Sequence, residues 1–163
     1  MSITLELVLA NVGASQQRRR DETNDKFSQR LFQLSLNDQS LKDMEGVEHF
    51  PNLRLLYLRN NQITQISHLD HLHLTHLDLQ YNCIERLDGL SACPALTHLY
   101  LSYNRIKEVI SLEGPKNLQE LHLSGQNLGS TDDSDNPPHL IIAPEVLEPV
   151  AVCAPITSFF TFS

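Results

Sequence analysis

The chain of 163 residues has no tryptophan, six glycines, three cysteines and only twelve basic residues against twenty acidic ones. The net charge of −8 argues against general binding to nucleic acid or to an anionic membrane, because phosphate groups attract the opposite charge. No apolar run approaches the roughly 20 residues of a membrane span. Glu6 interrupts the partly apolar N-terminus, which argues against a signal peptide. The cysteines are odd in number and do not have the spacing of a disulfide framework, which favours free thiols and a location in the cytoplasm.

The sequence also lacks nucleophile motifs and the glycine-rich loops that hold phosphate groups. Enzymatic activity and a bound cofactor are therefore not expected. What the sequence does contain is a repeat. Five segments carry leucine at their first, fourth and sixth positions and recur every 21 or 22 residues: 31–36, 53–58, 74–79, 96–101 and 118–123.

Each repeat continues with an amide three residues after its last leucine, and an aliphatic residue follows two positions later. The amides are Gln39, Asn61, Asn82, Asn104 and Gln126. This is the leucine-rich repeat pattern L-x-x-L-x-L-x-x-N-x-L, and fixed-period self-similarity of this kind indicates a solenoid. We predict an α/β leucine-rich repeat solenoid.

The spacing of the apolar residues predicts how each repeat is built. Alternation such as Leu56-Tyr57-Leu58 has the period of a strand, so short parallel strands should form the concave face. After the strand the apolar spacing becomes three, as in Ile63, Ile66, Leu69 and Leu72, which is the period of 3₁₀ turns. The convex face should therefore consist of 3₁₀ turns or loops.

The amides should form a structural ladder, because each lies where the chain turns inward and its side chain can satisfy buried backbone groups. The two glutamines, Gln39 and Gln126, occupy the end positions of the stack. We expect the longer amide to fit less well there, as is usual for atypical terminal repeats.

The chain divides into three parts. Residues 1–30 are predicted to be an N-terminal cap and polar linker, with Ile3 to Leu9 covering the first repeat and Arg18 to Arg20 in a solvated linker or helix start rather than a basic binding patch. Residues 31–128 hold the five repeats. Residues 129–163 are predicted to be irregular and uncapped, acidic and proline-rich at first and apolar at the end. We interpret this end as that of a C-terminally truncated form, although a phenylalanine-rich tail that docks on a partner is an alternative.

Function in this fold is expected on the outward residues beside the strand leucines. All four tyrosines fall there, and tyrosine and arginine are enriched in binding hot spots. The alternative is that aromatic residues simply suit strands. The candidate partner-binding residues are Tyr57, Arg59, His76, Asp78, Tyr81, His98, Tyr100, Tyr103 and His122.

The histidines allow a second interpretation. His76 and His98 share one position in adjacent strands, about 5 Å apart by strand spacing, with Asp78 and His122 near. Such a set could ligate zinc or act in acid–base catalysis. A third ligand at an established spacing and a His-Glu-x-x-His motif are both missing, so we expect no metal and favour polar contacts to a partner. An enzyme with a His/Asp metal site remains the remote alternative.

These repeats resemble those of leucine-rich repeat regulators of protein phosphatase 1 and of the axonemal dynein light chain of the same class. The resemblance extends to Leu5-Glu6-Leu7-Val8 and to the stretches 53–61, 122–128 and 140–147. It implies a non-catalytic scaffold that binds the catalytic subunit of protein phosphatase 1, microtubule-associated or motor proteins, and the cytoskeleton and centrosome.

An Arg/Lys-Val-x-Phe docking motif is missing, since Lys107-Glu108-Val109-Ile110-Ser111 lacks the aromatic residue. Any docking on the phosphatase would therefore use the concave face. The alternative within binding proteins is an axonemal or ciliary factor that contacts dynein or tubulin.

Overall fold

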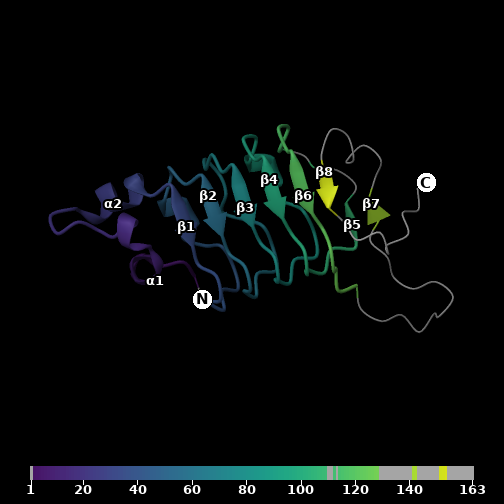
Figure 1. The fold of residues 1–163 in the computed structure, drawn as a ribbon, viewed down its shortest axis with the longest axis horizontal. Coiled ribbons are helices and arrows are strands. Elements are labelled where there is room, and N and C mark those ends of the chain that lie inside the picture. Colours follow the sequence, from purple (N-terminus) through teal and green to yellow (C-terminus); the bar gives the residue numbers. More distant parts are fainter. Residues whose placement is uncertain (1, 110–111, 113, 129–140, 143–150, 154–163) are drawn as a thin grey trace.

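A row of short parallel strands runs along the molecule (Figure 1). The computed structural model describes residues 2–109, 112, 114–128, 141–142 and 151–153. Its six-stranded sheet has the order β1 (Gln33–Ser35), β2 (Leu55–Tyr57), β3 (His76–Asp78), β4 (His98–Tyr100), β6 (Glu120–His122) and β8 (Ala151–Cys153). The order follows the sequence, so each repeat lies beside the next one, and the predicted solenoid of parallel strands is confirmed.

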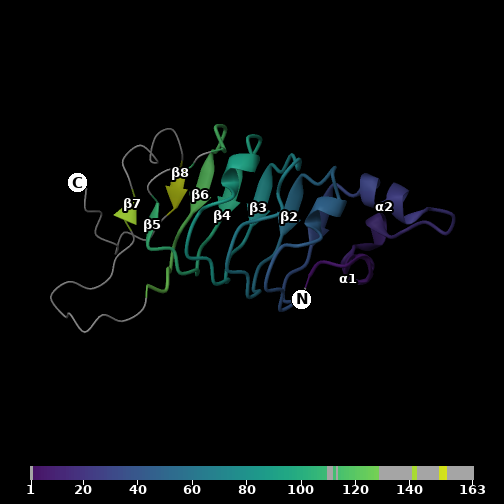
Figure 2. The same ribbon diagram turned by 180° about the vertical axis from the view of Figure 1, so that it is seen from behind.

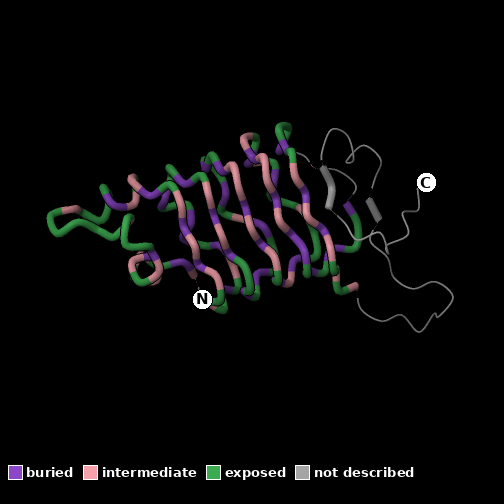
Figure 3. The backbone as a smooth tube through the Cα atoms, viewed as in Figure 1, coloured by how far each residue is buried: buried purple, intermediate pink, exposed green. Residues whose placement is uncertain are grey.

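The leucines of the repeat form the core. In β1, β2, β3, β4 and β6 the middle residue is a buried leucine and its two neighbours are half-buried. The strand register places these leucines in one continuous row: Leu34, Leu56, Leu77, Leu99 and Leu121. Figure 3 shows the alternation of buried and half-buried residues along each strand. Each repeat therefore buries its apolar face only against its neighbours.

The return segments contain short 3₁₀ helices in two of the repeats, Val47–His49 and Leu90–Ala92. Each begins after a glycine in the left-handed region, and a Cβ at Gly89 would lie 2.0 Å from the carbonyl oxygen of Ile66. The segment between β2 and β3 is one residue shorter and contains no 3₁₀ helix, although its residues are all described. His68 adopts the left-handed conformation there, with a φ of 59°. The predicted 3₁₀ geometry thus holds in the repeats 31–52 and 74–95, whereas the repeat 53–73, of 21 residues, uses turns instead.

The asparagine ladder is present. Asn82 donates from Nδ2 to the carbonyls of Leu58 (2.9 Å) and Leu79 (3.1 Å), and its Oδ1 accepts from the N–H of Ile63 (3.0 Å). Asn61 and Asn104 repeat this pattern one turn earlier and one turn later. Each amide therefore joins its own turn to the preceding repeat, where water has little access.

The two glutamines behave differently from one another. Gln126 donates from Nε2 to the carbonyls of Leu101 (2.9 Å) and Leu123 (3.0 Å), so the expectation that a longer amide fits poorly is wrong at this position. Gln39 lies outside the ladder, because its Nε2 donates only to the carbonyl of Asn37 (2.9 Å), two residues away. The reason is positional: a ladder amide needs a carbonyl from an earlier repeat, and Gln39 belongs to the first.

Two helices, α1 (Leu5–Asn11) and α2 (Asn24–Arg30), lie at the end of the sheet beside β1 in both views (Figure 1, Figure 2). Threonine side chains cap them: the hydroxyl of Thr4 accepts from the N–H of Leu7, and that of Thr23 accepts from the N–H of Lys26. Val8 and Phe27 are fully buried against the first repeat. The N-terminal segment therefore covers the apolar edge, where the sequence predicted a cap.

The polar linker between the two helices is held by one ion pair. Arg30 donates from Nε to Glu22 at 2.7 Å, and this hydrogen bond lowers the pKa of the Glu22 carboxyl to about 2. Arg18 to Arg20 are exposed, in agreement with a solvated linker.

The C-terminal part differs from the irregular tail that the sequence predicted. A short strand β7 (Ile141–Ile142) pairs with β5 (Glu108–Val109), and β8 pairs with β6 so that Val152 is in register with Leu121. The backbone of β8 thus continues the sheet by one strand, because the unpaired edge of β6 accepts a further parallel partner. The phenylalanine-rich end lies outside the described residues. No helix among the described residues has the length and hydropathy that crossing a membrane requires.

Candidate functional site

The concave face is built from the outward residues that flank the buried middle leucine of each strand. The register arranges them in two rows across the repeats. The first row is Leu55, His76, His98 and Glu120; the second row is Tyr57, Asp78, Tyr100 and His122. These side chains are half-buried, so they are held in place by their neighbours and still reach solvent.

The stacked histidines occupy the centre of the first row. The rings of His76 and His98 lie parallel, with centroids 4.1 Å apart and an interplanar angle of 7°. Burial, and next the neighbouring His98, lower the pKa of His76, while the charge of Glu120 opposes this effect. The predicted proximity of these two histidines therefore holds.

Threonine hydroxyls fix the orientation of both rings. The Oγ1 atom of Thr97 contacts the carbonyl oxygen of Thr75 (2.9 Å) and Nδ1 of His98 (2.8 Å). Thr75 has the corresponding contacts with the Arg54 carbonyl and with His76 Nδ1. Each threonine hydroxyl thus holds Nδ1 of the ring that follows it, and Nε2 of His98 faces Glu120.

Glu120 lies between two histidines. Its Oε1 is 3.9 Å from Nε2 of His98, its Oε2 is 3.6 Å from Nε2 of His122, and the hydroxyl of Tyr100 donates to Oε2 at 3.3 Å. Burial first, and then the charges of Glu120 and Asp78, raise the pKa of Tyr100, so its phenol stays protonated near neutral pH. Strands β3, β4 and β6 thus each supply an imidazole group, Tyr100 supplies a phenol, and Asp78 and Glu120 supply carboxylates.

Glu120 was not among the residues that the sequence analysis selected. The available signal was its position, because it occupies the same place in its repeat as His76 and His98 do in theirs. Thr75 and Thr97 were also missed. They precede the histidines directly, and only the structure shows that their hydroxyls contact the rings.

A second group, the tyrosine stack of Arg59, Tyr81 and Tyr103, follows the strands. The two tyrosine rings lie 4.3 Å apart with an interplanar angle of 12°, and the guanidinium of Arg59 is 4.7 Å from the centroid of Tyr81. Tyr103 also packs against Gly125, where a Cβ would lie 2.6 Å from the ring. Tyr103 nevertheless remains 48% exposed.

The backbone of the tyrosine stack is unusual. Tyr81 and Tyr103 have φ angles of 56° and 60°, in the left-handed region that bulky residues rarely adopt. The same position is left-handed in every repeat, and its occupants are Asp38, Asn60, Tyr81, Tyr103 and Gly125. A non-glycine residue in this conformation costs about 1–3 kcal/mol, and such strain is concentrated at functional sites.

The structure therefore places five of the nine candidates on the adjacent strands β3, β4 and β6: His76, Asp78, His98, Tyr100 and His122. Of these, His98, Tyr100 and His122 lie next to Glu120. Tyr57 is in register with Asp78, and its presence contributes to the raised pKa of Tyr100. Arg59, Tyr81 and Tyr103 form the separate stack. No three histidine, cysteine, aspartate or glutamate side chains in the described part of the chain are grouped so as to hold a metal ion.

The two cysteines with described side chains, Cys83 and Cys93, are free thiols. Burial raises the pKa of the Cys93 thiol to about 11, which suits a structural residue and not a nucleophile.

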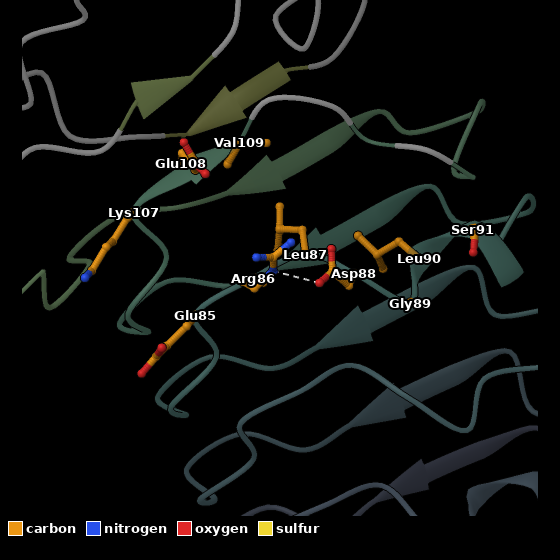
Figure 4. Close-up of a pocket in the computed structure, with 10 residues that line it drawn as sticks. All are labelled: Glu85, Arg86, Leu87, Asp88, Gly89, Leu90, Ser91, Lys107, Glu108 and Val109. Atoms are coloured by element: carbon orange, nitrogen blue, oxygen red, sulfur yellow. Dashed lines mark hydrogen bonds and ion pairs between the residues drawn. The ribbon is translucent and has the colours of Figure 1, made fainter.

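A hollow on the opposite side of the molecule is lined by residues 85–91 and 107–109 (Figure 4). Its main polar feature is the ion pair between Arg86 Nε and Asp88 Oδ2, at 2.8 Å, and these side chains are 80% and 76% exposed. Glu85 and Lys107 point away from the other lining residues. Exposed charges that already pair with one another provide no built site, so the concave face is the better candidate.

Comparison with known families agrees with the repeat geometry. One model of leucine-rich repeats matches residues 51–106, and a second, of two repeat copies, matches residues 29–71. The chain is a leucine-rich repeat protein. Leucine-rich repeat proteins are generally non-catalytic and bind protein partners, so a protein-binding scaffold is the class of function that the family indicates.

Among solved structures, an internalin of Listeria monocytogenes is similar to this leucine-rich repeat chain. The two share 26% sequence identity with a TM-score of 0.59, and the match covers 74% of this chain and 37% of the internalin. The chain therefore matches little more than a third of that protein. No curated protein matches the chain.

Proposed function

We propose that this leucine-rich repeat chain is a non-catalytic scaffold that binds a protein partner through its concave face and regulates protein phosphatase 1. The observation that carries the proposal is the cluster around Tyr100, in which phenol, imidazole and carboxylate groups are held half-buried by the strand register. Tyrosine in such a setting buries a large rigid surface and keeps a polar end for the partner.

The identity of the partner rests on resemblance. The segment Leu5-Glu6-Leu7-Val8, the second repeat, the fifth repeat and the stretch after it resemble protein phosphatase 1 regulatory subunit 42, a leucine-rich repeat protein of testis. On this basis the partner is the phosphatase catalytic subunit, and the chain acts in the cytoplasm, at the microtubule cytoskeleton and centrosome. Because an Arg/Lys-Val-x-Phe motif is lacking, the concave face is the surface that we assign to docking.

The test is a binding measurement with purified phosphatase catalytic subunit. Tyr100→Ala removes the aromatic surface at the centre of the cluster and should weaken binding by about tenfold, since hot-spot truncations cost 1 kcal/mol or more. Phe32→Ala is the matched control, because Phe32 is an exposed aromatic residue that precedes β1 and lies outside the cluster. Its binding should equal that of the wild-type chain.

Equal binding by Tyr100→Ala and wild type would contradict docking through this face. Failure of the wild-type chain to bind the phosphatase would remove the assignment of the partner. Co-sedimentation with microtubules and with axonemal dynein then tests the second candidate, a dynein- or tubulin-binding factor, which the same resemblance in the repeats supports.

A further inference from the structure

The carboxylate of Glu120 accepts one side-chain hydrogen bond within the described part of the chain. The hydroxyl of Tyr100 donates to Oε2 at 3.3 Å. The other oxygen, Oε1, lies 3.9 Å from Nε2 of His98, which is beyond hydrogen-bond distance. Oε1 can therefore accept a hydrogen bond from a donor outside the chain.

The charges of the concave face point in the same direction. The titratable groups in the two rows are Tyr57 from β2, His76 and Asp78 from β3, His98 and Tyr100 from β4, and Glu120 and His122 from β6. None of them is a lysine or an arginine, and the guanidinium of Arg59, which follows β2, packs on Tyr81. Within the described residues no lysine or arginine forms an ion pair with Asp78 or Glu120. Two carboxylates thus face solvent without a permanent cationic partner.

We propose that the concave face binds a lysine- or arginine-bearing segment of a partner protein at Glu120, and that protonation of the flanking histidines releases it. An ammonium or guanidinium group carries several N–H donors, so it can donate a charge-assisted hydrogen bond to Oε1 of Glu120, while the aromatic surface of Tyr100 packs on its aliphatic part. The proposal rests on the concave face being the binding surface, and it deepens the proposed function by stating the chemistry of the partner.

The same geometry explains the release. When His98 is protonated, Nε2 carries a hydrogen and its ring a positive charge beside Oε1 of Glu120, so the imidazolium competes with the donor of the partner. Protonation of His122, whose Nε2 is 3.6 Å from the other oxygen, has the same effect. Each proton also adds a positive charge that repels a basic segment. Because histidine changes its charge between about pH 5 and 8, binding should be strong above neutrality and weak in mild acid.

A library of random short peptides displayed on phage is the probe. Selection on the purified full chain at about pH 7.5, with elution at about pH 5.5, should enrich lysine and arginine several-fold over the unselected library. A synthetic peptide from the selection is then titrated by fluorescence anisotropy. Glu120→Gln should weaken it by about tenfold, as expected for a lost charge-assisted hydrogen bond. Glu85→Gln removes an equal charge from the opposite side and should leave the affinity unchanged.

His98→Gln tests the release mechanism, because glutamine keeps an acceptor near this position and does not titrate. In this variant the loss of affinity between about pH 7.5 and 5.5 should be clearly smaller than in the wild type. Circular dichroism at both pH values shows that the chain stays folded. Peptides without basic residues, or equal affinities for wild type and Glu120→Gln, would overturn the proposal. If the selected peptides lack basic residues but bind Tyr100→Ala more weakly than wild type, the concave face remains the binding surface. If they bind Tyr100→Ala and wild type equally, the result contradicts the proposed function itself.

Discussion

The asparagine ladder and the concave face are both columns of side chains that recur once per repeat, yet they differ in almost every other respect. The ladder positions carry the same group in repeat after repeat, and Asn61, Asn82 and Asn104 are nearly or fully buried. The first row of the concave face carries leucine, two histidines and a glutamate in successive strands, and all of them are half-buried.

The difference follows from what each column contacts. A ladder amide bonds backbone groups, and these are the same in every repeat whatever the neighbouring side chains are. A residue of the concave face contacts other side chains and solvent, so the fold places few demands on its identity. The ladder residues are therefore uniform because the backbone requires the same group in each repeat. The residues of the concave face vary because the fold does not determine them, so they are free to suit a partner.

The strongest test of this contrast is Asn82→Leu. The substitution keeps the volume but leaves the N–H of Ile63 without its partner and removes one of the two amide hydrogen bonds that each of the carbonyls of Leu58 and Leu79 accepts. Because a buried unsatisfied group costs about 1–3 kcal/mol and a lost hydrogen bond about 0.5–1.5 kcal/mol, we expect a loss of about 2 kcal/mol or more in the free energy of unfolding, measured by urea denaturation.

Gln39→Leu is the matched control for that experiment. It makes the same kind of change in the same column, but the side-chain amide of Gln39 donates only to the nearby Asn37 carbonyl. Its stability should change by about 0.5 kcal/mol or less. If both leucine variants are equally stable, the ladder does not act as described.

A smaller effect is expected from Thr97→Val, because Thr97 contacts both the backbone, as the ladder amides do, and a side chain of the concave face. The hydroxyl of Thr97 bonds the Thr75 backbone and also orients the ring of His98. We expect a loss of about 1 kcal/mol of stability and weaker binding of the partner at the concave face. Thr97→Ser keeps the hydroxyl and should restore both properties, so a serine variant as defective as the valine variant would contradict the role of this group.

The smallest change in stability is expected for Tyr103→Asn in the tyrosine stack. Asparagine tolerates the left-handed backbone, which relieves strain of about 1 kcal/mol or more. The lost stacking with Tyr81 costs about 0.5–1.5 kcal/mol, so the two effects nearly cancel. Thermal melting should therefore show little change. A large drop in the melting temperature would mean that the stack supports the fold and is not reserved for a partner.

Much of the architecture could be predicted from the sequence because local contacts determine it. The recurrence of Leu53, Leu74 and Leu96 requires parallel strands stacked in sequence order, and the structure has them in that register. The role of Asn82 also follows from its position after the strand. The behaviour of Gln126 did not follow, since whether a longer amide reaches the same two carbonyls depends on the backbone geometry of the last turn.

By itself the sequence determined the repeat length, the buried leucines and the residues that face outward, because side-chain direction in a strand depends only on its alternation. Only the tertiary structure decided that Glu120 lies between His98 and His122, since those contacts join neighbouring strands at particular rotamers. The same holds for the threonine contacts that orient the histidine rings and for the left-handed backbone under Tyr81 and Tyr103. The chemistry of the concave face arises from contacts between repeats, and periodicity within one repeat cannot specify them.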